Sequence, residues 1–387
     1  MHLTRTASPL LALLAYAGFA AAPAAAQTYT FKDLGTLGGT NSVGSGVNDS
    51  GQVVGASSLS GDSTFRAFLS GANGGILKDL GTLSTLSGYT SYGYAVNDSG
   101  QVAGGSYLTS DNTIFHAFLS GANGGKLKDL GTLGGTADLG LAVNTSGQVT
   151  GDAYLSGNNI VHAFLSAADG GALTDLLTLG GPNSRGFGVN ASGQVAGYSD
   201  TTVNGVEHAF LSGVGGGALK DLGTLGGINS RAYGVNAPGQ VTGGAYLSGN
   251  TLYHAFLSAT NGGPLTDLGT LGGTISYGRG VNDSGQVVGS SSLGGTTTQD
   301  AFLYSGGVMT DLNSLIAPGS GFTLTEAKSI SDTGYISGIG TNSLGETHAF
   351  LLAPKSVPEA STTASFGLLI VLGLGSLVVA RRRHINA

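Results

Sequence analysis

Five histidines recur at matching places along the chain, and such a set invites a metal-binding interpretation. They are His116, His162, His208, His254 and His348. A zinc ion holds its protein ligands within about 2.1 Å, and these usually come from one local cluster. Arg66 and Asp300 occupy the matching place in two further copies of the same motif. Because a position that accepts Arg and Asp has no fixed ligand chemistry, we expect the histidines to be structural, hydrogen-bonded residues.

Two other recurring polar residues, the Asp of an Asp-Leu-Gly motif and the Asn of a Val-Asn motif, could suit calcium binding or acid catalysis. A calcium loop needs acidic oxygens at several close and defined positions. The residue after the Val-Asn asparagine is an Asp, such as Asp49, in some copies but Thr145, Ala191 and Ala237 in others. Since alanine offers no ligand atom, these motifs favour roles in capping and in turns.

Motifs for several other chemistries are missing. The chain has no Cys, which excludes disulfides, thiol nucleophiles and cysteine-based metal sites. It also lacks GxxxxGK[ST], HExxH and a GxSxG elbow followed by a plausible helix. Two carboxylates from different repeats could still converge as in a glycosidase, but the sequence singles out no pair. We therefore predict no catalytic, cofactor-binding or metal-ligating residue.

The elements that must position these residues are copies of one unit, recognised by three signatures in a fixed order. The DLGTL signature begins at Asp33, Asp79, Asp129, Asp175, Asp221, Asp267 and, in weakened form, Asp311. The VNxSGQVxG signature has its asparagine at Asn48, Asn97, Asn144, Asn190, Asn236 and Asn282, with a degenerate seventh copy, ISDTGYISG. The HAFL signature has its phenylalanine at Phe68, Phe118, Phe164, Phe210, Phe256, Phe302 and Phe350. The sequence thus holds seven repeats.

Each repeat predicts four short strands joined by tight turns. In one copy SYGYAVN leads into the turn NDSG, QVAGGSYL returns, and IFHAFLSG and KLKDLGTL follow a polar loop. Gly51 and its equivalents can adopt the positive φ that closes such a hairpin. Four strands in about 46 residues are typical of a propeller blade, whereas a β-helix coil is shorter and a β-sandwich domain is about twice as long. We predict an all-β fold, a seven-bladed β-propeller over residues 27–354.

The order of the signatures also predicts how the ring closes. The body begins with a DLGTL strand at 30–37 and ends with THAFLLAP at 347–354. The seventh repeat therefore lacks a fourth strand, and the first strand of the chain is unassigned. Pairing these two ends would leave no open sheet edge at the seam.

Residues that differ among repeats are where specific chemistry would lie, because symmetry explains the others. They cluster in the predicted loop between the second and third strands of each repeat. These loops are rich in Ser, Thr, Asn and Gly and carry Tyr107, Tyr154 and Tyr246. Such groups suit a carbohydrate or another protein as ligand, and they equally suit simple solvation.

Both ends of the chain predict targeting segments. Residues 1–26 combine Arg5, an apolar run and a small-residue cleavage site around Ala24 and Ala26, which is typical of a secretory signal peptide. After a linker at 355–363, residues 364–380 form an uncharged run just long enough to span a bilayer as a helix. Three arginines open the tail at 381–387, and the positive-inside rule places that tail in the cytoplasm with the body outside.

Charge excludes one class of partner. Without the two ends, residues 27–357 hold 11 basic and 21 acidic residues, a formal charge near −10. A body of this charge would repel phosphates, so we predict no nucleic-acid binding.

The combination of HAFL, DLGTLGG and VNxxGQVVG resembles the extracellular HAF-repeat family over roughly residues 30–353. The C-terminus, over 357–384, is similar to a PEP-CTERM sorting signal, with Val357, Pro358, Glu359 and Ala360 where that family usually has a second proline. The resemblance implies export in a Gram-negative type of envelope and cleavage near Glu359 by an exosortase. It also implies a link to exopolysaccharide or the outer surface, and it assigns no catalytic residue and no cofactor.

Taken together, these features favour an exported, surface-associated propeller that acts as a non-catalytic binding or structural module. Its expected partners are the exosortase-type sorting machinery, extracellular polysaccharide or surface proteins, and the membrane before processing. The alternatives are a propeller enzyme, a hydrolase or lyase, acting on polysaccharide, and a self-associating surface coat. Acidic residues with perturbed pKa values in a central channel would favour the enzyme. An aromatic and polar face would favour binding.

Overall fold

The computed structural model describes residues 28–84, 88–109, 113–296 and 298–355, and residues 28–355 form one compact unit. Among these residues, no helix is long and apolar enough to cross a membrane. The predicted signal peptide, the sorting motif at Val357, Pro358 and Glu359, and the apolar run at 364–380 lie outside the described residues.

Strands dominate the described chain and pair in antiparallel groups of four that follow the repeats. In pairing order they are β2 (Gly38–Val47), β3 (Val53–Leu59), β4 (Phe65–Ser70), β5 (Leu77–Asp79); β6 (Ser91–Val96), β7 (Val102–Tyr107), β8 (Phe115–Ser120), β9 (Leu127–Asp129); β10 (Gly134–Val143), β11 (Val149–Leu155), β12 (Val161–Ser166), β13 (Leu173–Asp175); β14 (Gly180–Val189), β15 (Val195–Thr201), β16 (Glu207–Gly213), β17 (Gly217–Asp221); β18 (Gly226–Val235), β19 (Val241–Leu247), β20 (Tyr253–Ser258), β21 (Leu265–Asp267); β22 (Gly272–Val281), β23 (Val287–Leu293), β24 (Gln299–Ser305), β25 (Val308–Asp311); and β26 (Phe322–Ile330), β27 (Ile336–Asn342), β28 (Thr347–Pro354), β1 (Tyr29–Asp33). Two short 3₁₀ helices, η1 (Ala168–Gly170) and η2 (Leu312–Leu315), complete the described elements.

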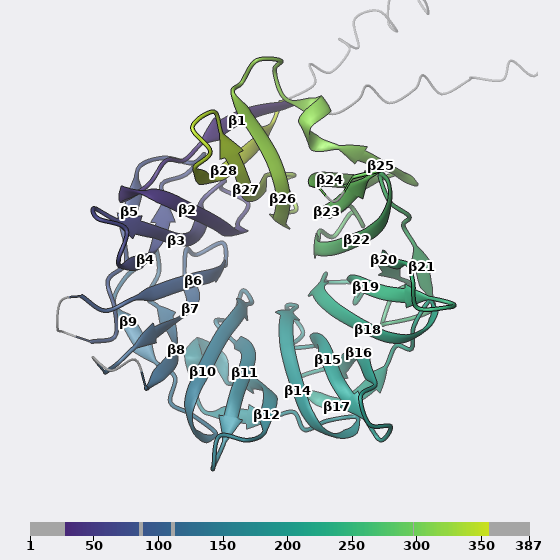
Figure 1. Ribbon diagram of the computed structural model, residues 1–387. Coiled ribbons are helices and arrows are strands. Elements are labelled where there is room, and N and C mark those ends of the chain that lie inside the picture. Colours follow the sequence, from purple (N-terminus) through teal and green to yellow (C-terminus); the bar gives the residue numbers. More distant parts are fainter. Residues whose placement is uncertain (1–27, 85–87, 110–112, 297, 356–387) are drawn as a thin grey trace, which may run out of the picture. The chain divides into compact units, whose positions relative to one another are not determined.

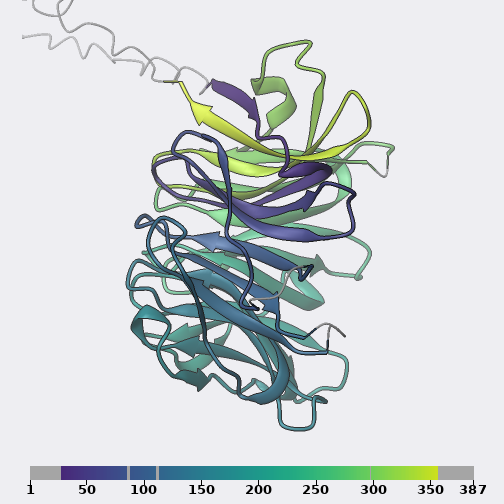
Figure 2. The same ribbon diagram turned by 90° about the vertical axis from the view of Figure 1, so that its left-hand side faces the viewer.

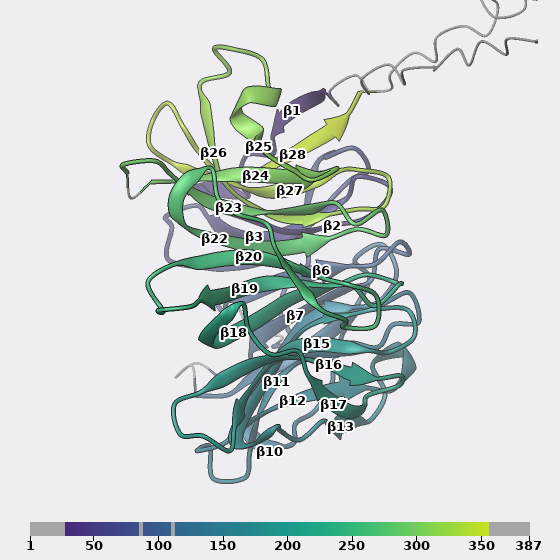
Figure 3. The same cartoon turned by 90° about the vertical axis from the view of Figure 1, so that its right-hand side faces the viewer.

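These groups are arranged around a common centre, with the first strand of each repeat innermost (Figure 1). Side views show the sheets stacked one upon another around the ring, with connecting loops projecting on both faces (Figures 2 and 3). The predicted turn chemistry is confirmed at Gly51, whose φ is +67° in the turn between β2 and β3. The repeat pattern therefore predicted the element order and the hairpin turns.

The hydrophobic core lies between neighbouring sheets and is distributed around the ring. The phenylalanine of each HAFL signature is completely buried. Phe164, for example, packs with Ala103 and Leu119 of the preceding repeat and Val149 of its own. Because each sheet buries both faces against its neighbours, Ala, Phe and Leu along one HAFL strand are all buried, as expected for a ring of sheets.

The two ends of the body meet at the seam, as the signature order predicted. β1 pairs with β28 in antiparallel register from Tyr29 opposite Pro354 to Asp33 opposite Phe350. On the next sheet, Val47, Val53 and Phe68 share a buried cluster with Ala349 and Leu351. Backbone pairing and apolar packing thus both join the N-terminal part of the body to its C-terminal part.

A belt of asparagine side chains ties the innermost strands to one another. Each Val-Asn asparagine donates from Nδ2 to the backbone carbonyl of the equivalent residue in the next repeat. The links run from Asn48 to Asn97, Asn144, Asn190, Asn236, Asn282 and finally Ser331, with distances of 2.9–3.3 Å. Ser331 has no side-chain amide to continue the belt back to the first repeat. Thr333 makes this last link instead, because its N–H donates to Asp49 Oδ1 at 3.0 Å.

The same asparagine also closes its own turn, so one side chain serves two purposes. Asn48 Oδ1 accepts the backbone N–H groups of Ser50 and Gln52, and its Nδ2 also donates to Gln52 Oε1. Asn48 is only 3% exposed, and its amide is fully engaged. This explains the Asn and the Gln of VNxSGQ together, because the six repeats that carry the pair use it to hold their own turn and to bind the next repeat.

The belt predicts a position-specific sensitivity to charge. Replacing Asn190 by Asp removes the donor to the Asn236 carbonyl and sets a buried carboxylate against that oxygen. We expect Asn190→Asp to lower the free energy of unfolding by about 2–4 kcal/mol. Ala191→Asp is the matched control, because Asp49 and Asp98 already occupy that place in other repeats. Chemical denaturation of both variants checks this, and equal effects would contradict the belt.

The seam can be tested by a covalent bond, because the chain has no cysteine of its own. Thr30 and Ala353 face each other in the β1–β28 register. Facing residues of antiparallel strands have Cα atoms about 4.5–5.5 Å apart, which is within the range of a disulfide. We expect the double variant Thr30→Cys, Ala353→Cys to form this bond and to gain about 2–4 kcal/mol over its reduced form. Thermal unfolding with and without reductant measures the gain. Failure to form the intramolecular bond on oxidation would show that the ends do not meet this way.

Candidate functional site

The five histidines lie in separate repeats, each paired with its own aspartate. Nδ1 of each lies 2.8–3.0 Å from the carboxylate of the Asp in the adjoining DLG motif, in the pairs His116–Asp129, His162–Asp175, His208–Asp221, His254–Asp267 and His348–Asp33. The same carboxylate accepts the backbone N–H two residues further on, as Asp129 does from Gly131. The structure thus brings no two of these histidines together, and each has the hydrogen-bonded arrangement expected of a structural residue.

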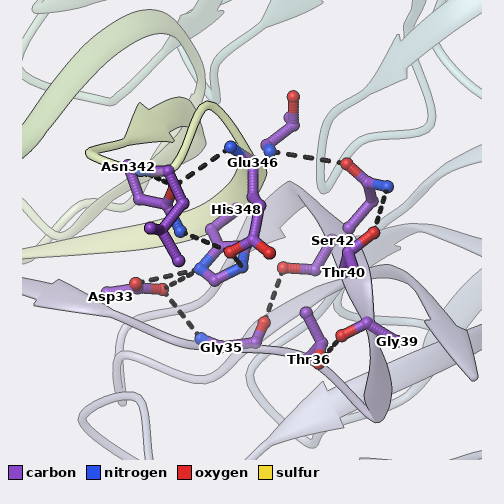
Figure 4. Close-up of polar contacts among 12 residues, drawn as sticks. Asp33, Gly35, Thr36, Gly39, Thr40, Ser42, Asn342, Glu346 and His348 are labelled. Atoms are coloured by element: carbon purple, nitrogen blue, oxygen red, sulfur yellow. Dashed lines mark hydrogen bonds and ion pairs between the residues drawn. The ribbon is translucent and has the colours of Figure 1, made fainter. Parts of the chain in front are cut away.

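At the seam, the pair joins the two ends of the body (Figure 4). His348 of β28 contacts Asp33 of β1 at 2.9 Å, and Asp33 also accepts the N–H of Gly35. Two repeats have Arg66 or Asp300 in place of the histidine, and there the histidine–aspartate pair is replaced by other interactions. Arg66 donates from Nε to the Tyr89 carbonyl, while the pKa of Asp300 is raised by burial and by Asp311 nearby.

Non-repeated side chains also gather on the innermost strands. Each of these strands contains a register shift near its C-terminal end, at which one residue has no partner on the second strand. Such a bulge re-aims the side chain of the unpaired residue. The unpaired residues are Ser45, Tyr94, Leu141, Phe187, Tyr233, Arg279 and Lys328, three positions before each Val-Asn asparagine or its equivalent. We call this set the bulge ring.

The bulge ring lines a cavity of about 410 Å³ at one end of the central channel. All of its members border this cavity, together with Val43, Ala56, Phe65, Tyr92 and Gly93. The asparagine belt lines a separate cavity further along the same strands. One end of the channel is therefore built from repeated residues. The other end is built from the bulge ring, in which only tyrosine occurs twice.

Sequence reasoning placed the variable chemistry in the loops and missed the bulge ring. A signal was present, because each ring residue lies between two small residues, as in Gly-Phe-Gly, Ala-Tyr-Gly and Gly-Arg-Gly. The structure shows why these neighbours are small. A Cβ added at Gly46 would lie 3.1 Å from Cα of Ala95, and one at Gly280 would lie 3.1 Å from Cα of Ser329. Adjacent inner strands approach too closely for larger side chains at these positions.

Aromatic side chains and a cation pack against one another in the part of the bulge ring formed by β14 to β22. Phe187 lies 5.6 Å from Tyr198 and 5.5 Å from Tyr233, measured between ring centroids. The Arg279 guanidinium lies 4.7 Å from the centre of the Tyr233 ring and 4.9 Å from that of Tyr277, in range for cation–π attraction. These contacts fix the rings and the cation in a single layer beside the cavity.

The cations of this layer are held by carboxylates from neighbouring strands. Glu326 accepts from Arg279 Nε at 2.7 Å and lies 3.3 Å from Lys328 Nζ. Burial opposes ionisation of Glu326, but the two cations outweigh it and lower its pKa. Arg185 likewise pairs with Asp152, but there burial outweighs the cation and raises the pKa of the carboxyl. Glu326 is therefore an ionised counter-ion, unsuited to the role of a general acid.

The opposite end of the channel holds several aspartates, all of them bonded to the backbone. Asp98 Oδ1 accepts the N–H of Asp49, and Asp332 Oδ1 accepts that of Asp283. The pKa of Asp332 is raised by burial and by the neighbouring carboxylates. No group of acidic or histidine side chains suited to a metal ion occurs in the described ranges. These aspartates cap the turns, which agrees with the capping role expected from the sequence.

Asp138 breaks the repeat in the interior of the protein. The equivalent residue in most other repeats is a serine, such as Ser184, whose hydroxyl accepts the Ala163 N–H and donates to the Leu177 carbonyl. Asp138 is 1% exposed, and the Tyr154 amide approaches its carboxyl without closing a well-formed hydrogen bond. Burial, with Asp152 and Asp129 nearby, raises the pKa of Asp138 to about 7.

The arrangement is suited to binding and carries no acid–base pair at the cavity. Within the described part of the chain, no carboxyl group borders the cavity of the bulge ring. The carboxyl groups of Asp138 and Asp152 have raised pKa values, but these side chains are buried below the surface. The cavity instead offers aromatic faces, hydroxyls and cations, the groups that fix the orientation of a bound ligand.

Comparisons with known proteins show the fold class. No family model matches the chain, and no curated protein matches it. The β-propeller domain of the Trilobed protease from Pyrococcus furiosus, reported with an open velcro topology, is 8% identical, with a TM-score of 0.54 over 85% of this chain and 95% of that one. TolB from Acinetobacter baumannii is 12% identical, with a TM-score of 0.43 over 79% of this chain and 64% of that one. Trypanosoma rangeli sialidase is 12% identical, with a TM-score of 0.41 over 84% and 55%.

The likeness to the Pyrococcus domain concerns the fold alone, and it agrees with the pairing of the strands. The chain is an all-β protein with a β-propeller fold. In this propeller β1 pairs with β28, so its seam is closed by a strand from the other end of the body.

Asp138 predicts a pH-dependent stability. Its folded pKa of about 7 exceeds its ordinary value of 3.8, so the folded state holds the proton more tightly. This tighter proton binding stabilises the folded state fully below about pH 4, and the stabilisation is lost as the pH rises through 7. We expect Asp138→Ser, which restores the residue of the other repeats, to raise the melting temperature by several degrees at pH 8 and by much less at pH 5.

Asp138→Asn provides the control, because it removes the charge while keeping the shape. It should flatten the pH dependence of the melting temperature in the same way. Equal shifts of the variants at pH 5 and pH 8 would show that Asp138 ionisation does not limit stability.

Proposed function

We propose that this protein is an exported, seven-bladed β-propeller that acts as a non-catalytic binding module at the cell surface or in the extracellular matrix. Each four-stranded group is one blade, and the last blade takes its outer strand from the N-terminus. The ligand binds in the cavity of the bulge ring. Extracellular polysaccharide is the ligand class that fits its aromatic and hydroxyl groups best.

The observation that carries this proposal is the contrast between the ring and its scaffold. The belt, the HAFL phenylalanines and the turns repeat almost without change, whereas the bulge ring presents Ser, Tyr, Leu, Phe, Arg and Lys. A structural position in a repeat protein has a repeated environment and accepts a repeated residue. Positions that differ around one shared cavity provide the asymmetric surface that a specific ligand requires.

A polysaccharide-cleaving enzyme is the alternative function. Most glycoside hydrolases use two carboxyl groups, one on either side of the scissile bond. Among the described residues that border the ring cavity there is none, and Glu326 nearby is neutralised by Arg279 and Lys328. Binding is therefore the function that this geometry supports best.

The proposed localisation rests on the two ends of the chain. A signal peptide cut after Ala26 would direct export, and the run at 364–380 would hold the body outside the membrane. An exosortase-type enzyme would then process the chain at Val357, Pro358 and Glu359. Mass spectrometry of the mature protein from cell surface fractions tests this, and a chain that keeps residues 364–387 there would argue against processing.

The binding function is tested with the full chain, kept in a zwitterionic detergent because sugar-headed detergents would compete. The protein is incubated with isolated matrix polysaccharides and with defined oligosaccharides. We expect retention of one or more saccharides with no change in their length. Shortened chains would establish the enzyme instead, and the absence of any retention would overturn the proposal.

The location of the site is tested by filling the cavity. Ser45→Tyr places in the ring a side chain that the scaffold already accepts at Tyr94 and Tyr233. We expect at least about a tenfold loss of saccharide affinity, with stability changed by less than about 1 kcal/mol. Thr145→Tyr adds the same ring at the opposite channel end and should leave affinity unchanged. Equal affinities for the two variants would place the ligand elsewhere.

A further inference from the structure

A second cavity opens beside the bulge ring and shares a wall with it. It has a volume of about 360 Å³ and is bordered by Arg231, Tyr233, Tyr246, Asn250, Tyr253 and Tyr277, among others. We call it the tyrosine cleft. Tyr233 borders both cavities, and Arg279 lies against Tyr233 and Tyr277. The two cavities therefore form adjoining parts of one surface across β18 and β22.

The tyrosine cleft combines ring faces with hydrogen-bond donors. Tyr246 and Tyr253 meet edge to face with centroids 4.9 Å apart, and Tyr253 lies 5.2 Å from Tyr277. Asn229 and Asn250 each use their side-chain oxygen to accept a backbone N–H, which leaves their NH₂ groups as donors toward a ligand. Phenol rings with an apolar face and a polar edge, beside amide donors, match the alternating C–H and O–H groups of a sugar ring.

The cations of this surface outnumber its carboxylates. Arg231 is held by Glu207, through Nε at 2.7 Å and Nη2 at 2.6 Å, so its other guanidinium N–H groups stay available. Arg279 and Lys328 share Glu326 alone. Three cations thus face two carboxylates, a local excess of one positive charge in a body whose formal charge is near −10. Side-chain exposures of 43% for Arg231, 31% for Arg279 and 32% for Lys328 leave all three within reach of solvent.

We infer that the bulge ring and the tyrosine cleft bind one acidic oligosaccharide, with successive sugars in the two cavities. The tyrosines contact the sugar faces, while Arg279, Arg231 and Lys328 bind carboxylate groups. Guanidinium donors match a carboxylate in geometry and charge, and a neutral sugar would leave them without an anion. This inference rests on the proposed saccharide-binding function and adds the charge and the extent of the ligand.

The test compares two ligands with the same sugar backbone, one anionic and one neutral. A short oligogalacturonate is titrated calorimetrically into the full chain, and its fully methyl-esterified form is titrated in parallel. We expect the acid to bind at least about tenfold more tightly and to lose that advantage as the ionic strength rises. Polyglutamate serves as an anion without sugar rings, and equally tight binding of it would show that charge alone is recognised, contradicting the inference.

The outcomes separate this inference from the proposed function. If the acid and the ester bind equally, the acidic ligand is excluded while saccharide binding stands. If no saccharide binds under any condition, both proposals fail. If the acid binds but Tyr277→Ala and wild type are equal in affinity, the cleft takes no part and the two-cavity site is overturned.

Variants with matched controls assign the residues. Lys328→Gln removes a cation while Glu326 stays paired with Arg279, so the fold is preserved, and we expect affinity for the acid to fall by about three- to tenfold with the ester unaffected. Lys128→Gln makes the same change on an outer strand, where Lys128 donates to the Asp169 carbonyl, and should have no effect. Tyr277→Phe, which keeps the ring, should retain most of the affinity lost in Tyr277→Ala. Equal losses for Lys328→Gln and Lys128→Gln would overturn the charge assignment.

Discussion

The asparagine belt is the interaction on which the rest of this propeller depends. A ring of sheets has no continuous hydrogen-bonded ladder between neighbours, so the inner strands need another polar link. Each asparagine supplies it by donating to the next repeat's carbonyl while its oxygen closes its own turn. The desolvated backbone groups at the belt end of the channel thereby find partners. Packing of the HAFL phenylalanines between sheets then adds the apolar component of stability.

This fixed end allows the other end of the channel to vary. The bulge three residues before each asparagine leaves one side chain free of the ladder, while the small residues on either side accept the close approach of the strands. A substitution at the bulge changes what the channel offers without disturbing pairing or the belt. The scaffold thus separates the residues that hold the ring from those that can recognise a ligand.

Breaks in the repeat do not all point to a ligand. Asp138 replaces a serine that bridges neighbouring strands elsewhere, yet it is buried away from either cavity, and its effect is on stability. Arg279 and Lys328 break the repeat at the bulge and border the ring cavity. The recurring histidines, in contrast, have side chains that could bind a metal, yet their role is structural. Each pairs with the aspartate of its own repeat or, at the seam, with Asp33.

The sequence by itself determined the repeat length, the strand order, the turn at Gly51 and the pairing of the two ends, because these follow from local patterns and from counting signatures. It also indicated that the histidines and the residues after the Val-Asn asparagines are structural, because the first position accepts Arg and Asp and the second accepts Thr and Ala. Only the tertiary structure decided where the varied side chains meet. Ser45 and Lys328 are nearly 300 residues apart in the chain, and they share a cavity because the ring closes and a bulge in each inner strand turns one side chain toward it. A bulge arises from pairing between strands, and that pairing is set by neighbours the local sequence does not name.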